Sequence, residues 1–472
     1  MTERTLKAAV VGGGISGLSA AYYLQKQAKE QGLSLDLTLI EAVHRLGGKI
    51  QTLHRDDFVI ERGPDSFLSR TENINALARD LGIDSKLLAS GAGKSFVMVE
   101  DQLHPIPKGS VMGVPTEWGP FISSHLSSWS GKVRAAGDLI MPRSPEPADQ
   151  PLGKFMRRRF GKELVENLIE PIFSGLYGGD IDRMSLASTF PAFYEIEQQH
   201  RSLISGMKKD DSVDVDAFTT AKKGIFQTFQ NGMQTLVDAL EEALTGCTVL
   251  KGVKVESVRK EQDKAVLHLN NDSDLLVDEV IFALPHEKVQ PLFEPYGLLE
   301  AMKEMPSTSV ATVSMAFAKE AMQPETEEGM GFVVARNSDF TITKCLAMHT
   351  KWPAHVPAGK LLFKAFVGRP GDEAIVDLSD REIEKTVLAD LRKAIPISGD
   401  PEFTIVTRWK DAMPQYQVGH QDRIKTAKQD LKQAFPMIQL IGNSFEGGGL
   451  PACVEQGEAA ALQAINRLQL KK

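Results

Sequence analysis

The stretch that decides the fold is Gly12-Gly13-Gly14-Ile15-Ser16-Gly17, close to the start of the chain. An apolar run at residues 7–11 precedes it, and an amphipathic stretch beginning at Ile15 follows it. A second apolar run covers residues 35–40. This order predicts a strand, a tight turn, a helix and a second strand, which is the beginning of a parallel βαβ unit.

The glycines and a later carboxylate together predict a dinucleotide site. Gly12 and Gly14 permit a tight turn and let the backbone approach a diphosphate, and Gly17 allows the helix to pack closely on the strand. The helix N-terminus offers unpaired N–H groups to phosphates. Glu41 ends the second predicted strand, 24 residues after Gly17, where it can accept hydrogen bonds from ribose hydroxyls. A purely structural glycine turn is the alternative.

A basic, glycine-containing segment follows Glu41 and Ala42 directly. Arg45-Leu46-Gly47-Gly48-Lys49 resembles the RxGG extension of the amine-oxidase-like superfamily of FAD proteins. A second glycine pair exposes further backbone N–H groups to the diphosphate and ribityl chain, and Arg45 or Lys49 neutralises charge. A surface loop with solvated basic residues is the alternative.

A second glycine turn, Gly447-Gly448-Gly449, lies near the C-terminus between an apolar run at residues 438–441 and a helix predicted from Pro451 to Leu468. Glycines let the backbone pass close to a flat ring, and proline suits the first turn of a helix. The positive end of that helix would stabilise a reduced flavin. A plain strand-to-helix connection is the alternative.

Length and composition bound the class of protein. The chain has 472 residues, 42% hydrophobic and 25% charged, which predicts a soluble protein of two or three structural units. A net charge of −8 argues against a general nucleic-acid binder. Cys247, Cys345 and Cys453 lie about a hundred residues apart, so neither a disulfide framework nor a metal site is expected.

The chain carries no pattern typical of export or of a membrane span. Only six residues precede the first predicted strand, which leaves no room for a secretory signal. The longest stretch poor in charge, residues 109–131, contains Glu117 and two prolines. We therefore expect a cytoplasmic protein whose membrane contact, if any, is peripheral.

The middle and the second half of the chain change character several times. Residues 116–206 read as helical, with one helix over 152–169, and the polar segment 208–216 is predicted to be an exposed loop at a boundary. Three short runs, at residues 253–259, 265–269 and 279–283, predict a β-meander. Strands and a helix then alternate in an α+β unit, over residues 310–317, 361–367, 381–394 and 403–409.

Four longer segments carry a family resemblance. They are Glu61-Arg62-Gly63-Pro64-Asp65-Ser66-Phe67 and residues 170–180, 413–420 and 444–447. Each resembles a segment of the oxygen-dependent protoporphyrinogen and coproporphyrinogen oxidases, and the similarity runs from residue 7 to about 465. It is closest to the soluble enzymes of Gram-positive bacteria that oxidise coproporphyrinogen III to coproporphyrin III.

The resemblance implies an α/β plus α+β fold, in which a Rossmann-like FAD-binding domain of the amine-oxidase superfamily is joined to a substrate domain and a helical insertion. The FAD-binding domain is expected over residues 1–75, 220–290 and 405–472. The substrate domain is expected over 76–110 and 291–404. The helical domain, which in relatives touches the membrane, is expected over 111–219.

The resemblance also implies the residues that contact a noncovalently bound FAD. They are Gly12, Gly13, Gly14, Ile15, Ser16, Gly17, Glu41, Ala42, Arg45, Gly48, Lys49, Gly63, Pro64, Asp65, Ser66, Val255, Trp409, Gly447, Gly448 and Gly449. Val255 can equally be an ordinary strand residue. Asp65 replaces an arginine of the eukaryotic relatives, which puts their way of holding substrate carboxylates in doubt here.

The implied reaction is hydride transfer from a bridge carbon of the porphyrinogen to the flavin, after which oxygen reoxidises the flavin and yields hydrogen peroxide. This chemistry requires no acid–base triad, so no side chain is assigned as catalytic. The propionates of the substrate call for basic side chains. Arg70 is the first candidate, and Lys351 and Arg336 are weaker ones; each can instead be a solvated surface charge.

Other functions stay open from the sequence. They are oxidation of protoporphyrinogen IX, a flavin amine oxidase, a carotenoid desaturase and a flavin-free protein resembling inhibitors that bind prenylated GTPases. The expected partners are a porphyrinogen, molecular oxygen and, transiently, the next enzyme of haem synthesis; no nucleic acid is expected.

Overall fold

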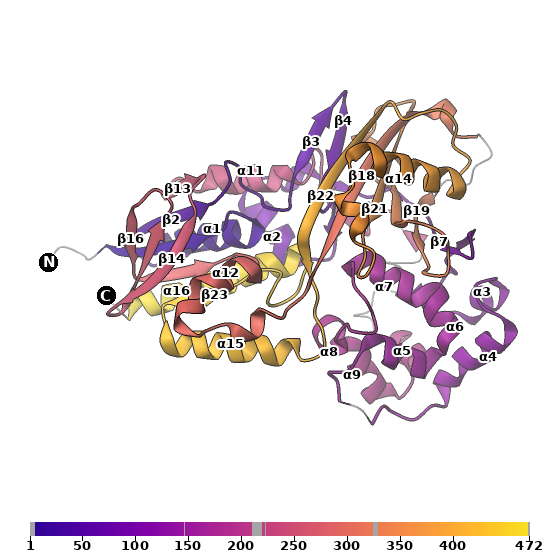
Figure 1. Ribbon diagram of the computed structural model, residues 1–472, viewed down its shortest axis with the longest axis horizontal. Coiled ribbons are helices and arrows are strands. Elements are labelled where there is room, and N and C mark those ends of the chain that lie inside the picture. Colours follow the sequence, from indigo (N-terminus) through magenta and orange to yellow (C-terminus); the bar gives the residue numbers. More distant parts are fainter. Residues whose placement is uncertain (1–4, 146, 210–219, 222, 324–328, 471–472) are drawn as a thin grey trace.

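A computed structural model describes residues 5–145, 147–209, 220–221, 223–323 and 329–470 (Figure 1). A parallel sheet with its helices forms one half of the molecule, and an antiparallel-rich sheet with a helical cluster beneath it forms the other. Most of the predicted boundary loop at residues 208–216 lies outside the described residues.

The first half is built on a five-stranded parallel sheet of order β13-β2-β1-β17-β23. Its strands are β1 (Leu6–Val11), β2 (Leu35–Glu41), β13 (Cys247–Lys251), β17 (Glu279–Phe282) and β23 (Ile438–Leu440). In β1, Ala8 and Val10 pack into the hydrophobic cluster on one face, and Ala9 and Val11 pack into the cluster on the other. The apolar run in the sequence reflects this burial on both faces.

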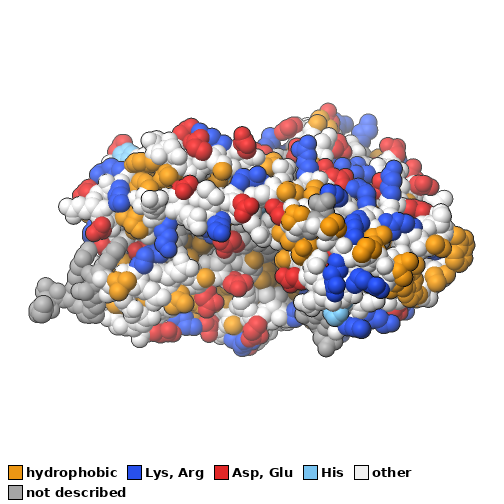
Figure 2. Space-filling model, turned by 90° about the horizontal axis from the view of Figure 1, so that it is seen from below, with side chains coloured by type: hydrophobic (Ala, Val, Ile, Leu, Met, Phe, Trp, Pro, Cys, Tyr) orange, Lys and Arg blue, Asp and Glu red, His pale blue; other side chains and the backbone are white. Residues whose placement is uncertain are grey.

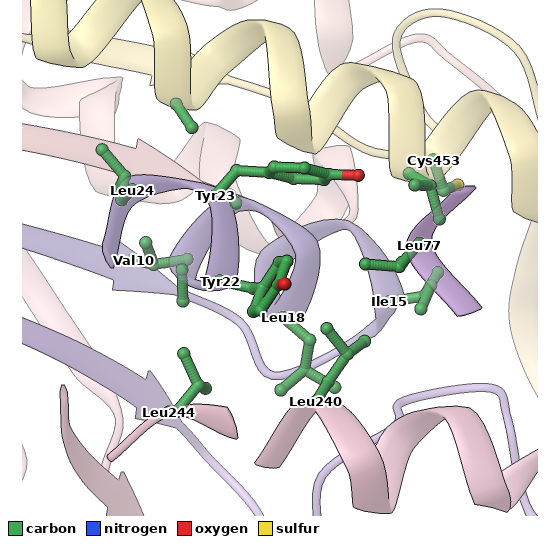
Figure 3. Packing of buried hydrophobic residues seen from close by; sticks show 14 of the residues in the cluster. Val10, Ile15, Leu18, Tyr22, Tyr23, Leu24, Leu77, Leu240, Leu244 and Cys453 are labelled. Atoms are coloured by element: carbon green, nitrogen blue, oxygen red, sulfur yellow. The ribbon is translucent and has the colours of Figure 1, made fainter. Parts of the chain in front are cut away.

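Helices cover one face of this sheet. They are α1 (Ile15–Glu30), α2 (Glu72–Asp80), α11 (Gln234–Ala243) and α16 (Leu450–Gln469). Figure 3 shows Leu18 and Tyr22 of α1 in the packed layer, with Leu240 of α11 on one side and Cys453 of α16 on the other. The predicted strand–helix–strand start and the C-terminal helix are therefore confirmed.

A meander and two helices, α12 (His286–Phe293) and α15 (His420–Ala434), cover the other face. The meander consists of β14 (Val255–Glu261), β15 (Lys264–Leu269) and β16 (Asp274–Val277). The prediction that residues 279–283 complete it is wrong. All four residues of β17 are buried because this strand lies between β1 and β23 in the parallel sheet.

The second half contains an eight-stranded sheet of order β11-β7-β19-β20-β21-β18-β22, in which β8 pairs with β7. Its strands are β7 (Gly93–Val99), β8 (Gln102–Pro105), β11 (Thr220–Ala221), β18 (Ser307–Ala318), β19 (Gly329–Val334), β20 (Ile342–Ala347), β21 (Lys360–Val367) and β22 (Phe403–Pro414). Helix α14 (Asp380–Ala394) packs on one face through Ile383, Val387 and Leu391. The opposite face carries polar side chains.

Short strands connect the two halves. They form the hairpin β3 (Thr52–Arg55) with β4 (Phe58–Glu61) and the small sheet β5 (Phe67–Leu68), β12 (Phe226–Phe229) and β6 (Leu87–Ala89). A further pair, β9 (Ser110–Val111) with β10 (Val114–Pro115), belongs to the second half, where Val111 and Val114 share a hydrophobic cluster with Phe155. The predicted domain limits near residues 75, 290 and 405 fall inside α2, α12 and β22. The domain limits stay a prediction.

The helical cluster contains α3 (Trp118–Ser123), α4 (Trp129–Ala136), α5 (Leu152–Phe160), α6 (Lys162–Leu164), α7 (Glu170–Tyr177), α8 (Leu186–Thr189), α9 (Pro191–His200) and α10 (Leu203–Met207). The prediction of a single helix over residues 152–169 is wrong, because Gly161 has a φ of +82° and separates α5 from α6. A π-helical turn at Val165–Ile169 then leads into α7.

Large hydrophobic side chains lie on the surface of this cluster. Trp129 and Val133, four residues apart on α4, are each 70% exposed, and Ile140 is 80% exposed. Figure 2 shows hydrophobic and basic side chains mixed over this half of the molecule. Among the described helices, none is long and apolar enough to cross a membrane.

Candidate functional site

The glycine turn after β1 leaves no room for a side chain at Gly12 or at Gly17. Gly12 has a φ of +109°, and a Cβ there would lie 2.5 Å from the carbonyl oxygen of Ala283, the residue that follows the neighbouring strand β17. A Cβ at Gly17 would overlap the carbonyl oxygen of Gly12. Gly14 is the N-cap of α1 and brings no side chain to the first helical turn. The backbone N–H groups of that turn therefore face the end of the sheet, as an anion site requires.

Glu41 is held at the carboxyl end of β2. Its Oε2 accepts a hydrogen bond from the N–H of Gly13 at 2.6 Å, and its Oε1 accepts one from the N–H of Val43 at 3.0 Å. A carboxylate has about four lone-pair sites, so each oxygen can accept a further donor. Glu41 is thus fixed beside the glycine turn with capacity left for hydroxyl groups. Exposed Ala42 follows it directly.

The RxGG loop is tied to the same turn. The N–H of Gly47 donates to the carbonyl of Gly13 at 2.8 Å. Arg45 donates to carbonyl groups of its own loop, including Gly48 O at 2.6 Å, so its guanidinium holds the loop together. Lys49 donates to the carbonyl of Ala412, and burial lowers the pKa of its ammonium group. Both basic residues are bound to backbone carbonyls of this chain.

The helices that follow the two glycine segments, α1 and α16, pack against each other although their first residues lie more than 400 positions apart in sequence. A Cβ at Gly457 would lie 2.7 Å from the carbonyl oxygen of Ser16, so only glycine allows this close approach. Gly442, which follows β23, lies beside the hydroxyl of Ser16. Gly449 is the N-cap of α16 and, like Gly14, brings no side chain to the first turn. Two helix N-termini thus flank one region.

The C-terminal glycine loop is fixed by the segment after β22. The hydroxyl of Tyr416 donates to Asn443 O, and it would lie 3.5 Å from a Cβ placed on Gly448. Nε2 of His420 donates to Phe445 O at 3.0 Å, and its ring stacks on that of Tyr416. Burial lowers the pKa of His420, which favours the neutral ring. The geometry gives His420 a structural role.

Val255 begins β14 with its side chain in the hydrophobic core. The segment just before it is bonded to the end of β2, through Val253 N–H to Glu41 O at 3.0 Å and Gly252 N–H to Val43 O at 3.1 Å. This places the backbone before Val255 beside the proposed ribose site.

The Gly63-Pro64-Asp65-Ser66 segment joins the two halves of the molecule. A Cβ at Gly63 would overlap the carbonyl oxygen of Lys49 and would lie 3.5 Å from the ring of Trp409. The indole N–H of Trp409 donates to Arg62 O at 3.0 Å. Asp65 accepts hydrogen bonds from Lys351 Nζ at 2.6 Å and from Trp352 Nε1 at 3.0 Å. Although burial opposes it, the nearby Lys351 and Lys364 hold the pKa of Asp65 well below its usual range.

One face of the eight-stranded sheet is polar where this segment crosses it. We call this group, Thr312, Ser314, Lys344, Lys364 and Thr407, the polar sheet face. Strand register places Thr407, Thr312, Phe366, Lys344 and Val333 side by side in one row across five strands. Residues opposite one another in a ladder point to the same side of the sheet.

Hydrogen bonds attach the 62–63 backbone to the polar sheet face. Thr312 donates to Arg62 O at 2.9 Å, and Lys364 Nζ donates to Gly63 O at 2.5 Å. Arg62 Nε in turn donates to Thr407 Oγ1 at 2.8 Å. At the other end of the row, α7 covers the sheet, because a Cβ at Gly175 would contact Val333 and the stem of Lys344.

A cavity of about 210 Å³ opens at the edge of this region. It is lined by three segments that the sequence separates widely, residues 180–184, 306–308 and 415–417, and by the turn at 370–373. Asp180 and residues 415–417 belong to the family motifs, and Tyr416 lines the cavity while it holds the C-terminal glycine loop.

The predicted substrate residues have different surroundings. Lys351 lies in a buried ion pair with Asp65 rather than in solvent. Arg336 donates to the buried carboxylate of Glu170 at 2.8 Å and remains 41% exposed. Arg70 is exposed in the turn between β5 and α2.

Sequence reasoning missed Lys344 and Lys364 on the polar sheet face. Each is the only charged residue of its strand core, in Ile342–Ala347 and in Leu361–Val367. A lone lysine in an otherwise apolar strand is the signal that could have indicated a buried charge.

Comparisons with known proteins show which family the chain resembles. The family described as "Flavin containing amine oxidoreductase" matches residues 15–465. The coproporphyrinogen III oxidase of Bacillus subtilis (strain 168) is 49% identical over 469 residues, covering 99% of this chain and 100% of that protein. That of Staphylococcus aureus (strain NCTC 8325 / PS 47) is 40% identical over 470 residues, covering 98% and 100%.

A solved structure shares the whole fold. The crystal structure of a protein from Exiguobacterium sp. 255-15, provisionally described as a protoporphyrinogen oxidase, has a TM-score of 0.87 and is 34% identical, covering 99% of both chains. The fold class and the family resemblance predicted from the sequence are confirmed.

Proposed function

Because this chain belongs to the flavin containing amine oxidoreductase family, we propose that it binds FAD noncovalently and oxidises coproporphyrinogen III to coproporphyrin III. The observation that supports this substrate is the 49% identity, over 99% of this chain and 100% of the relative, to the coproporphyrinogen III oxidase of Bacillus subtilis. The Staphylococcus aureus relative supports the same substrate.

The residues present fit FAD. We assign the diphosphate to the N–H groups of the first turn of α1, beside Gly12 to Gly17, and the ribose to Glu41. We assign the flavin ring to the region beside Gly63 and Trp409, and we assign the loop Gly447–Gly449 to the same ring, because the N-terminus of α16 favours negative charge. FAD, when bound there, supplies an acceptor for hydride.

The protein's own part in the reaction is to hold the substrate ring in place. We assign the substrate to the cavity beside Tyr416 and to the polar sheet face. Orientation of the bridge carbon toward the flavin ring is the main requirement, so we assign no general base. Oxygen as the final acceptor and hydrogen peroxide as its product belong to the proposal.

An aerobic assay tests the proposal. Purified protein is incubated with coproporphyrinogen III, protoporphyrinogen IX and putrescine in parallel, and porphyrin fluorescence and peroxide are followed. We expect the highest kcat/KM on coproporphyrinogen III. A higher kcat/KM on protoporphyrinogen IX would contradict coproporphyrinogen III as the substrate. Activity on the amine alone would contradict any porphyrinogen as the substrate.

Acid precipitation tests the noncovalent attachment, since the yellow colour should stay in the supernatant. Colour in the pellet would contradict it. The cytoplasmic location, peripheral membrane contact through the helical cluster and transient contact with the following enzyme stay predictions. For the membrane contact, co-sedimentation with anionic vesicles should weaken when exposed Trp129 is replaced by serine.

A further inference from the structure

Three lysines lie around Asp65, and their ammonium groups differ in what they contact. Lys351 donates to Asp65 and to Ser66 Oγ, and Lys364 donates to Gly63 O. Lys344 Nζ lies 5.0 Å from the centre of the Phe366 ring and, among the described residues, has no hydrogen-bond acceptor or carboxylate partner. Lys364 Nζ lies over the same ring at 5.3 Å. Lys344 therefore retains its hydrogen-bonding capacity.

The surroundings of Lys344 make an added anion favourable. Burial and the charges of Lys351 and Lys364 lower the pKa of Lys344 to about 8, with Asp65 as the opposing charge. The side chain is half-buried, and its stem lies against Gly175 of α7. An ammonium group in such a place is stabilised by a carboxylate, because a charge-assisted hydrogen bond replaces the water it has lost.

We propose that Lys344 binds a carboxylate of the substrate and thereby positions the tetrapyrrole over the polar sheet face, beside α7. This inference rests on the proposed function and names a residue of the substrate site. The diphosphate of FAD is a less suitable occupant, because the helix N-termini and Glu41 lie at the end of the other sheet. A propionate of the substrate is the anion that the proposed reaction brings to this region.

The test compares Lys344→Met, Lys344→Gln and Lys344→Arg with a control, Lys385→Met. Lys385 lies exposed on α14, which packs on the opposite face of the same sheet. Flavin content and thermal unfolding are recorded first. Binding of coproporphyrin III to each holoenzyme is then measured by fluorescence titration, and KM and kcat are measured separately with coproporphyrinogen III.

We expect both neutral variants to raise KM and the coproporphyrin Kd by about tenfold, the loss of one charge-assisted bond, with kcat within about twofold. Lys344→Arg should recover most of the affinity, and Lys385→Met should match the wild type. Unchanged KM and Kd in a flavin-loaded neutral variant would overturn the inference. Failure of the wild type to oxidise coproporphyrinogen III would instead overturn the proposed function.

Discussion

The parallel sheet and the eight-stranded sheet offer different chemical groups to the ligands that we assign to them. At the end of the parallel sheet, the groups are backbone N–H groups, in a turn where a Cβ at Gly12 or Gly17 would overlap backbone atoms. On the eight-stranded sheet they are side chains, two lysines and three hydroxyls on one face. A backbone site is suited to a cofactor that stays, and a side-chain site can be adapted to the carboxylates of one substrate.

The largest effect is expected at the backbone site. In Gly17→Ala, the new Cβ would overlap Gly12 O, so α1 must move away from the turn that we assign to the diphosphate. We expect the purified variant to contain almost no flavin. Gly119→Ala is the control, because a Cβ there meets nothing within 4 Å. Wild-type flavin content in Gly17→Ala, read from absorbance, would contradict the backbone account.

Asp65 tests the connection between the two sites. Asp65→Asn leaves the buried Lys351 ammonium without its carboxylate, and we expect a loss of about 3 kcal/mol in the free energy of unfolding. Asp65→Asn with Lys351→Met should recover most of it. The control, Asp377→Asn, removes an exposed pair with Lys410 and should change nothing measurable. Urea unfolding at pH 7 gives these values.

The sign of the pH effect for this pair follows from the lowered pKa of Asp65. Its stabilisation is present above the unfolded pKa of an aspartate and is lost as the pH falls through the folded pKa. The loss in the free energy of unfolding caused by Asp65→Asn should therefore be fully present at neutral pH. A deficit that grows on acidification would contradict the assignment.

Glu61, at the end of β4, predicts a pH dependence of the opposite sign. Burial raises its pKa to about 7, although the N–H of Met233 and the hydroxyl of Thr52 donate to it. Stability is then greatest below the unfolded pKa and falls as the pH rises through 7. The free energy of unfolding of Glu61→Gln, relative to that of the wild type, should therefore rise by about 3 kcal/mol between pH 4 and pH 8. An unchanged difference in urea midpoints would show that Glu61 titrates normally.

Glu41 should give the smallest effect. Glu41→Ala removes the proposed ribose contacts, and we expect FAD to bind about tenfold more weakly, on the order of one charge-assisted hydrogen bond. Glu41→Gln, which keeps one acceptor oxygen, should lose less. Glu455→Ala, an exposed carboxylate on α16, is the control. Equal FAD retention in Glu41→Ala and wild type after dialysis would remove Glu41 from the site.

The two sites also differ in how far the sequence predicts them. The strand, glycine turn and helix at residues 6–30 are formed by residues that are close in sequence. Because only glycine fits the close approaches at Gly12 and Gly17, a short stretch of sequence is enough to predict them. The polar sheet face depends on the register of four strands spread over about a hundred residues. Nothing near Lys344 in sequence indicates that Lys364 or Gly63 will lie beside it.

Long-range partners explain the other differences. From the sequence, Lys351 is a candidate for a substrate carboxylate or else a solvated surface charge, but Asp65, 286 residues away, binds it. In sequence, the run at 279–283 resembles a third strand of the meander. Its actual neighbours, β1 and β23, come from the two ends of the chain, so nothing near the run indicates its place in the parallel sheet. The interruption at Gly161 was missed because a glycine inside an amphipathic pattern is tolerated in many helices.

Anaerobic mixing of the oxidised holoenzyme with an equimolar amount of coproporphyrinogen III tests the central claim, that the backbone site holds a flavin which oxidises a substrate on the polar sheet face. We predict that the absorbance of oxidised flavin disappears on mixing and returns when oxygen is admitted, with coproporphyrin III as product. Flavin that stays oxidised with coproporphyrinogen III, in protein whose flavin is readily reduced by dithionite, would contradict the account.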